Sequence, residues 1–193
     1  MDTVGRHFAD HRDDAWLAGA CDMVDVDGQH VRPNRPTGDF ALAGALLRDE
    51  AHPFNLPQPG VFWRRSLHDR LGWLDESLHY CMDFEFWLRM LSAGLRPTLL
   101  DVGLATYRLY DASKTCTQSN GFLREHLVVE RRYARRLAWP DRLKVWRRLG
   151  YTQRALASRA SRRLLWTRVI QRPWWLGSQQ IRQALWGRVV SDQ

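Results

Sequence analysis

The chain has 193 residues, of which 45% are hydrophobic and 26% are charged. Both shares are ordinary for a globular protein, so disorder is excluded as the default state. No apolar run approaches the roughly 20 residues that cross a bilayer, and residues 1–14 are too polar for a secretory signal. The three cysteines are widely spaced, which indicates neither a disulfide framework nor a zinc site. We therefore expect a cytoplasmic protein.

The net charge of +8 is unevenly distributed along the chain. Residues 1–120 contain 12 basic and 17 acidic side chains, whereas residues 121–193 contain 17 basic and 4 acidic ones. The basic segment also holds six tryptophans, namely Trp139, Trp146, Trp166, Trp174, Trp175 and Trp186. Helices of this composition can lie on an anionic membrane surface. Alternatively, the segment packs its tryptophans on the rest of the protein and exposes its arginines. It contains no recognised nucleic-acid-binding motif, so we expect no nucleic-acid partner.

The first predicted elements are a hairpin and a helix. Residues 15–32 predict two short strands joined at Asp27 and Gly28, because an Asp-Gly pair between apolar stretches is typical of hairpin turns. Residues 39–48 predict a helix, with Asp39 placed where an aspartate can cap it.

The middle of the chain predicts further short elements. Residues 60–65 predict a buried strand, and residues 66–74 predict a helix that Ser66 caps and Gly72 interrupts. Residues 95–110 predict one or two strands.

Residues 83–93 form the clearest predicted helix. Gly94 ends it in the usual way. Its apolar side chains recur at helical spacing and define one face: Phe84, Trp87, Leu88 and Leu91. We therefore expect Trp87 and Leu88 in the core, and a structural role for Arg89.

From about residue 120 the pattern is helical to the end. The sequence thus predicts a mixed α/β part over residues 1–120 and an all-helical, basic, tryptophan-rich extension over residues 121–193. The α/β part is short for a complete domain, and its sheet would need more strands.

Three motifs follow one another in residues 56–91. They read QPGVFWRRS at residues 58–66, GWLDESLHY at residues 72–80 and MDFEFWLR at residues 82–89. Their order and spacing resemble the second half of the GT-A catalytic domain of family 2 glycosyltransferases. These enzymes often show "QPG-x-F-x-RRS", "G-x-x-DESLHY" and "MDYEFWLRL". Residues 106–115, TYRLYDASKT, are similar to the family's "YRLHPGSKT".

The resemblance covers roughly residues 15–130 and implies a partial GT-A fold without its N-terminal, nucleotide-binding half. The chain would then begin inside the domain, as a gene fragment, through a mis-assigned start codon or by artificial truncation. It also implies an inverting transferase that moves a sugar from a nucleotide-diphospho-sugar to a sugar or lipid-linked acceptor, in cell-surface polysaccharide synthesis. Such acceptors would suit a protein at the inner face of the plasma membrane.

Asp83 corresponds to the general base of that family. An aspartate at the start of a helix is held ionised by the helix dipole and can accept a proton from a sugar hydroxyl. The alternative is that Asp83 only caps the helix. Glu85, two residues on, is expected either to contact the acceptor or hold the loop, or to be a solvated or salt-bridged glutamate.

Gln58 and Gly60 stand where the family's chain passes close to the donor sugar, and glycine permits such an approach. The alternative is a simple Pro-Gly turn. Arg108 and Lys114 are expected diphosphate partners, because basic side chains offset phosphate charge. Tyr110 replaces a common histidine of the family and is a poor ligand for Mg²⁺.

The complete family enzyme binds Mg²⁺ or Mn²⁺ through an Asp-x-Asp motif, and the cation offsets charge on the departing diphosphate. Asp25-Val26-Asp27 matches that motif literally, but Gly28 follows at once and predicts a hairpin turn. We therefore expect the true ligands outside this chain, and no transfer by this chain alone. A second hypothesis is a non-catalytic, basic helical adaptor or remnant that binds an anionic membrane surface.

Overall fold

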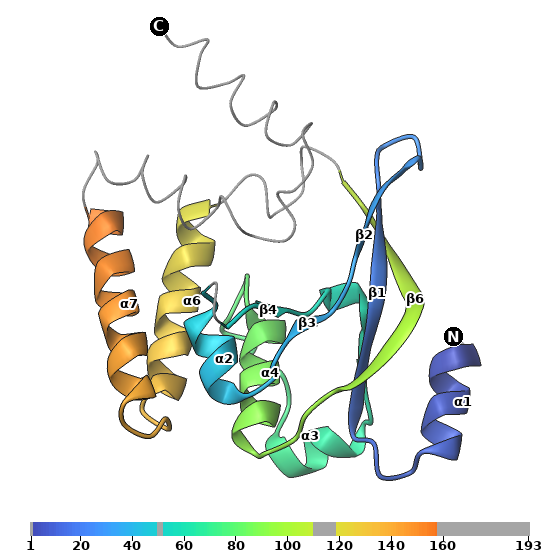
Figure 1. Ribbon diagram of the computed structural model, residues 1–193, viewed down its shortest axis with the longest axis horizontal. Coiled ribbons are helices and arrows are strands. Elements are labelled where there is room, and N and C mark those ends of the chain that lie inside the picture. Colours follow the sequence, from blue (N-terminus) through green and yellow to red (C-terminus); the bar gives the residue numbers. More distant parts are fainter. Residues whose placement is uncertain (1, 50–51, 110–118, 158–193) are drawn as a thin grey trace, which may run out of the picture. The chain divides into compact units, whose positions relative to one another are not determined.

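The computed structural model describes residues 2–49, 52–109 and 119–157 (Figure 1). The chain divides into two compact units, Met1–Leu149 and Gly150–Gln193. The elements below belong to the first unit, apart from the end of the last helix. They form a mixed α/β fold, as the sequence predicts, with one principal sheet and six α-helices in the described ranges.

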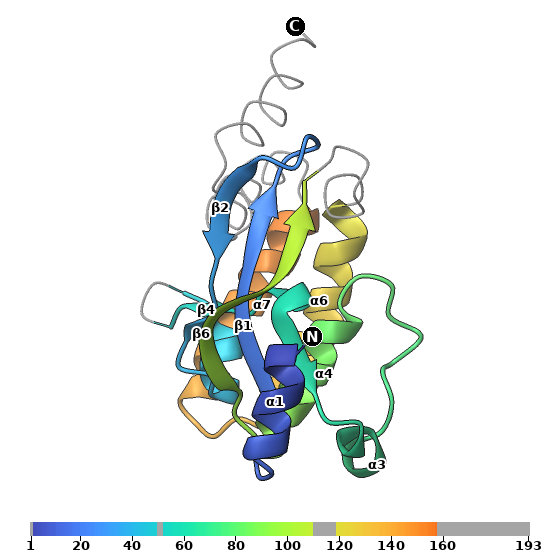
Figure 2. The same cartoon turned by 90° about the vertical axis from the view of Figure 1, so that its right-hand side faces the viewer.

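The principal sheet is built around β1 (Trp16–Val24). Strands β2 (His30–Asn34) and β5 (Val61–Trp63) pair with it antiparallel, through residues 21–24 and 16–18 of β1 respectively. Strand β6 (Thr98–Arg108) runs parallel to it from Leu17 to Val24. The pairing register of β6 shifts between Gly19 and Cys21 of β1. Figure 2 shows β6 crossing β1 part-way along its length, so that the end of β6 lies on the edge of β1 opposite β2.

The predicted hairpin at Asp27-Gly28 is confirmed. Oδ1 of Asp25 accepts hydrogen bonds from the backbone N–H groups of Asp27 (3.0 Å) and Gln29 (2.8 Å). Gly28 has φ +82°, a conformation that residues with a Cβ rarely adopt. Asp25 therefore builds the turn between β1 and β2.

The predicted helix 39–48 is shorter in the structure. Helix α2 is Leu42–Leu47, with Ala41 at its N-cap. Asp39 does not cap it, because its Oδ1 accepts the N–H of Ala41, two residues on, in a turn that precedes the helix. A second sheet flanks this region and consists of β3 (Thr37–Gly38) and β4 (Phe54–Asn55), followed by the 3₁₀ turn η1 (Gln58–Gly60).

Helix α3 is Ser66–Leu71, and here the predicted cap is also wrong. Ser66 is the first helical residue and Arg65 occupies the N-cap position, without a side-chain hydrogen bond. Gly72 ends the helix with φ +85°, as predicted. Residues 73–81 then lead to α4 (Met82–Ser92).

Helix α4 matches its prediction to within a residue at each end. All four side chains of the predicted apolar face are buried, and Trp87 and Leu88 belong to the core. Gly94 follows with φ +78°, and its N–H bonds the carbonyl of Leu91 at 3.0 Å.

Helices cover both sides of the principal sheet (Figure 1). Helix α1 (Asp2–Asp10) lies on one side and contains no buried residue. Helices α2, α4 and α6 (Ser119–Ala134) lie on the other, where α6 contacts both α2 and α4. Helix α7 (Asp141–Ala157) follows α6. Within the described ranges, no helix is both long and apolar enough to cross a membrane.

Candidate active site

The candidate site lies at the first turn of α4. Residues 93–97 connect the end of α4 to the start of β6, so the helix runs back against the direction of β6 and β1 (Figure 1). Its N-terminus therefore lies toward the carboxyl ends of these two parallel strands. In α/β sheets this is the end at which ligands usually bind.

Asp83 is the second residue of α4, after the N-cap Cys81 and Met82. Its side chain is half-buried, and Oδ1 accepts the N–H of Phe84 at 2.7 Å. Burial raises the pKa of Asp83, and backbone hydrogen bonds from Phe84 and Asp83 itself oppose that shift only in part. This corrects the expectation that the helix terminus holds the carboxylate ionised, because burial outweighs the backbone donors.

The structure also contradicts the alternative that Asp83 is the N-cap of α4. The N-cap position belongs to Cys81, which makes no side-chain capping bond. A carboxyl group with a raised pKa is the stronger base once it is ionised, and catalytic carboxylates are commonly tuned in this direction. The environment of Asp83 is therefore suited to proton transfer.

The chain that enters α4 is fixed by a carboxylate from α6. Glu125 accepts the backbone N–H of His79 at 2.9 Å and that of Tyr80 at 2.7 Å. The thiol of Cys81 lies 3.7 Å from the same carboxylate. Burial, together with the charges of Glu125 and Asp83, raises the pKa of Cys81, so this thiol stays protonated. Glu125 thus positions the residues next to Asp83.

Glu85 matches the salt-bridged alternative. Only 2% of its side chain is exposed, and it forms an ion pair with Arg89 on the same helix. The hydroxyl of Tyr133, in α6, donates to Oε1 of Glu85 at 2.5 Å. Burial and this contact raise the pKa of Tyr133 to about 12. Glu85 therefore joins α4 to α6.

The structural role expected of Arg89 is confirmed. Besides pairing with Glu85, its Nη1 donates to the carbonyls of Leu71 at 2.9 Å and Trp73 at 2.8 Å. Arg89 thereby ties the end of α3 and the start of the following loop to α4.

Gln58 and Gly60 lie on η1, beside β1. A Cβ on Gly60 would come within 2.6 Å of the carbonyl oxygen of Gly19. The sequence predicted that the donor sugar comes close to the backbone at Gly60. In the structure, the backbone of β1 lies close to this glycine. Gln58 is exposed at the start of the turn.

Arg108 ends β6, opposite Val24 of β1. Its side chain is exposed and donates to the carbonyl of Val26, in the hairpin turn, at 2.6 Å. The structure thus groups Arg108 with the hairpin, whereas Asp83 and Glu85 belong to α4. Lys114 and Tyr110 lie outside the described residues.

The structure contains a charge cluster around the buried Glu130 that was not predicted from the sequence. Glu130, in α6, forms ion pairs with Arg48 and Arg148, and His126 lies 3.8 Å from it. The Arg48 guanidinium also lies 4.6 Å from the ring centre of Phe84, next to Asp83. The spacing of His126 and Glu130, four residues apart in a helix, was the only local signal. Arg48 is too distant in sequence to be assigned to them.

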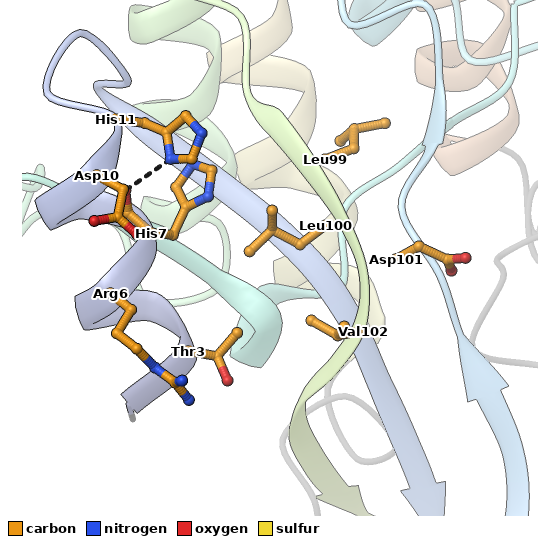
Figure 3. Close-up of a pocket in the computed structure, with 9 residues that line it drawn as sticks. All are labelled: Thr3, Arg6, His7, Asp10, His11, Leu99, Leu100, Asp101 and Val102. Carbon is orange, nitrogen blue, oxygen red and sulfur yellow. Dashed lines mark hydrogen bonds between the residues drawn. The ribbon is translucent and has the colours of Figure 1, made fainter.

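A hollow of about 490 Å³ lies between α1 and β6, and it contains none of the sequence-predicted site residues. His7 of α1 and His11, which directly follows that helix, face Leu99 and Leu100 of β6 across it (Figure 3). His7 Nε2 lies 2.6 Å from Oδ2 of Asp14, and this hydrogen bond lowers the pKa of Asp14.

The described residues do not fit a divalent cation. They contain no group of three or more His, Cys, Asp or Glu side chains arranged to hold one. Oδ1 of Asp25 accepts two backbone N–H groups of the turn, which gives the Asp25-Val26-Asp27 segment a role in the hairpin.

Comparison with known proteins found no family model, no curated protein and no solved structure that matches this chain. The likeness to glycosyltransferases therefore rests on the motifs at residues 58–66, 72–80, 82–89 and 106–115.

Proposed function

We propose that this chain is the acceptor-side part of an inverting, GT-A-type family 2 glycosyltransferase, with Asp83 as the general base. The proposal rests on the environment of the Asp83 carboxyl group. It is a half-buried carboxyl with a raised pKa, at the head of a helix whose entry loop is fixed by Glu125. The glycosyltransferase motifs coincide with this arrangement.

In the proposed reaction, Asp83 accepts the proton of an acceptor hydroxyl. The acceptor oxygen then attacks the anomeric carbon of the nucleotide-sugar from the face opposite the diphosphate. The C–O bond to the diphosphate breaks, and the nucleoside diphosphate leaves with the electron pair. The configuration at the anomeric carbon is inverted.

The donor site is proposed to require residues outside the described part of the chain. Arg108 is exposed at the carboxyl end of β6 and is a candidate partner of the diphosphate, together with Lys114. The Mg²⁺ or Mn²⁺ of the complete enzyme would be bound by those outside residues. Gln58, exposed beside β1, remains a candidate for donor contact.

The second candidate is a basic adaptor on an anionic membrane, favoured by the 17 basic and 4 acidic side chains of residues 121–193. The reading frame upstream of Met1 separates the two. An in-frame nucleotide-binding half with an Asp-x-Asp motif supports the transferase, whereas stop codons support the adaptor.

The direct test is a transfer assay on the natural polypeptide that contains these residues together with a donor-binding half. It is incubated with UDP- and GDP-sugars, Mn²⁺ and saccharide acceptors, and release of nucleoside diphosphate is measured. Acceptor-dependent release supports the proposal, and its absence with every donor would contradict it. The 193-residue chain alone is expected to bind these donors weakly and to release none.

A further inference from the structure

Trp73 presents an aromatic face to solvent beside the candidate site. It lies in the loop between α3 and α4, and 64% of it is exposed. One face of its indole is stacked on the ring of His68, with 4.4 Å between ring centres and 4° between planes. The opposite face has no ring against it among the described residues.

This tryptophan is held in place. Trp63 Nε1 donates to His68 Nε2 at 3.0 Å, which leaves the proton of the neutral ring on Nδ1, 3.3 Å from the carbonyl oxygen of Gly72. His68 also stacks on the buried Phe86. The carbonyl of Trp73 itself is bonded by Arg89. The indole therefore keeps its orientation without a ligand, which lowers the entropic cost of binding one.

A hollow of about 400 Å³ adjoins Trp73, within the usual range of small-molecule sites. Its apolar lining includes Leu78 and Met82, and its polar lining includes the exposed Glu76 and His79. Met82 directly precedes Asp83 in α4. The hollow thus combines a flat apolar face, a carboxylate and an imidazole.

We propose that this hollow binds a pyranose ring of the acceptor saccharide, stacked on the free face of Trp73. A pyranose has C–H groups on one face and hydroxyls around its edge. The C–H face matches the indole, and the hydroxyls match the hydrogen-bonding groups of Glu76 and His79. The identity of the ring as part of the acceptor rests on the proposed transferase function.

Binding is tested on the full 193-residue chain by saturation-transfer-difference NMR. The probes are the methyl glycosides of glucose, galactose, mannose and rhamnose, together with cellobiose. We expect millimolar binding of at least one probe, with the strongest transfer to its ring C–H protons. Trp73→Ala should weaken binding at least tenfold, and Trp73→Phe should retain part of it.

The matched control is Trp139→Ala, because Trp139 is 67% exposed but lines neither described hollow. It should bind the probes as the wild-type chain does. Absence of binding to every probe, or unchanged binding by a folded Trp73→Ala variant, would overturn the inference. Transfer activity is a separate readout, so saccharide binding without transfer would contradict the proposed function and leave this site standing.

Discussion

Asp83 and Glu85 show how two carboxylates close in sequence reach different environments. Asp83 is half-buried and accepts a hydrogen bond from the backbone N–H of Phe84, whereas Glu85 is bonded by Arg89 and Tyr133. The sequence could place both on the first turns of α4. It could not decide the role of Glu85, because Tyr133 lies 48 residues away in the chain.

Glu85→Ala is expected to reduce the free energy of unfolding by about 3–5 kcal/mol, because it removes the buried carboxylate that binds the part-buried Arg89 guanidinium and the Tyr133 hydroxyl. Urea denaturation measures this loss. Glu76→Ala, at an exposed position, should change stability by no more than about 0.5 kcal/mol. Equal stability of the Glu85→Ala variant and the wild type would contradict a structural role for this pair.

His126 should make the fold sensitive to acid. It is buried, and burial together with Arg48 and Arg148 lowers its pKa well below the ordinary value. Between that lowered pKa and about pH 6.5, the unfolded chain binds a proton that the folded chain does not. Stability therefore falls as the pH drops below about 6.5, by up to about 1.4 kcal/mol per pH unit.

His126→Phe should remove this share of the pH dependence, and phenylalanine suits a site beside the rings of Phe84 and Phe122. Val128→Ala, at an exposed position of α6 without a titrating group, is the control and should leave the pH profile unchanged. Chemical denaturation between pH 5 and 8 tests the expectation. Identical pH profiles for His126→Phe and the wild type would count against it.

At the scale of elements, the loop that enters α4 depends on α6. Glu125→Ala removes the acceptor of two backbone N–H groups, so we expect a loss of about 1–3 kcal/mol in unfolding free energy. Arg124→Ala, at the adjacent exposed position, should change little. Cys81 provides a second readout, because its thiol should react faster with alkylating agents in Glu125→Ala. Unchanged stability and thiol reactivity would show that Glu125 does not fix the loop.

Periodicity predicted α4 well because its apolar face is long enough to define one side of a helix. The starts of α2 and α3 were predicted less well. Asp39 and Ser66 are residue types that favour caps, but Asp39 forms a turn before α2 and Ser66 is already helical. The residue type alone does not show which residue becomes the N-cap. That depends on the backbone conformation of the residues just before the helix.

At the scale of the whole molecule, the mixed α/β class and the hairpin followed from the sequence. The parallel pairing of β1 with β6 did not, because Leu17 and Thr98 are far apart in the chain. That pairing forms only when the whole sheet assembles, and the connection from α4 to β6 then directs the start of α4 toward the carboxyl ends of both strands.

The charge of residues 121–193 predicts affinity for anionic lipid. Each basic side chain near such a surface contributes about 1 kcal/mol, and salt screens the attraction. Flotation with vesicles that contain phosphatidylserine should therefore recover the chain at low salt and lose it as salt is added. Equal recovery on neutral phosphatidylcholine vesicles would contradict an electrostatic interaction.

The most direct test of the central claim is Asp83→Asn in the polypeptide that also contains the donor-binding half. Asparagine is nearly isosteric but cannot accept the proton, so we expect kcat to fall by at least about 10²–10⁴-fold. Because burial raises the pKa of Asp83, its ionised form costs stability at neutral pH, and the variant should melt no lower than the wild type. Donor affinity should be unchanged.

Asp69→Asn, at an exposed position in α3, serves as the control and should keep full activity. The measurement is kcat for both variants, beside thermal melts and donor titrations. The predicted result is a large loss of kcat confined to Asp83→Asn, with an intact fold and intact donor binding. Retention of most activity by Asp83→Asn, or its loss only through unfolding, would contradict the assignment of Asp83 as the base.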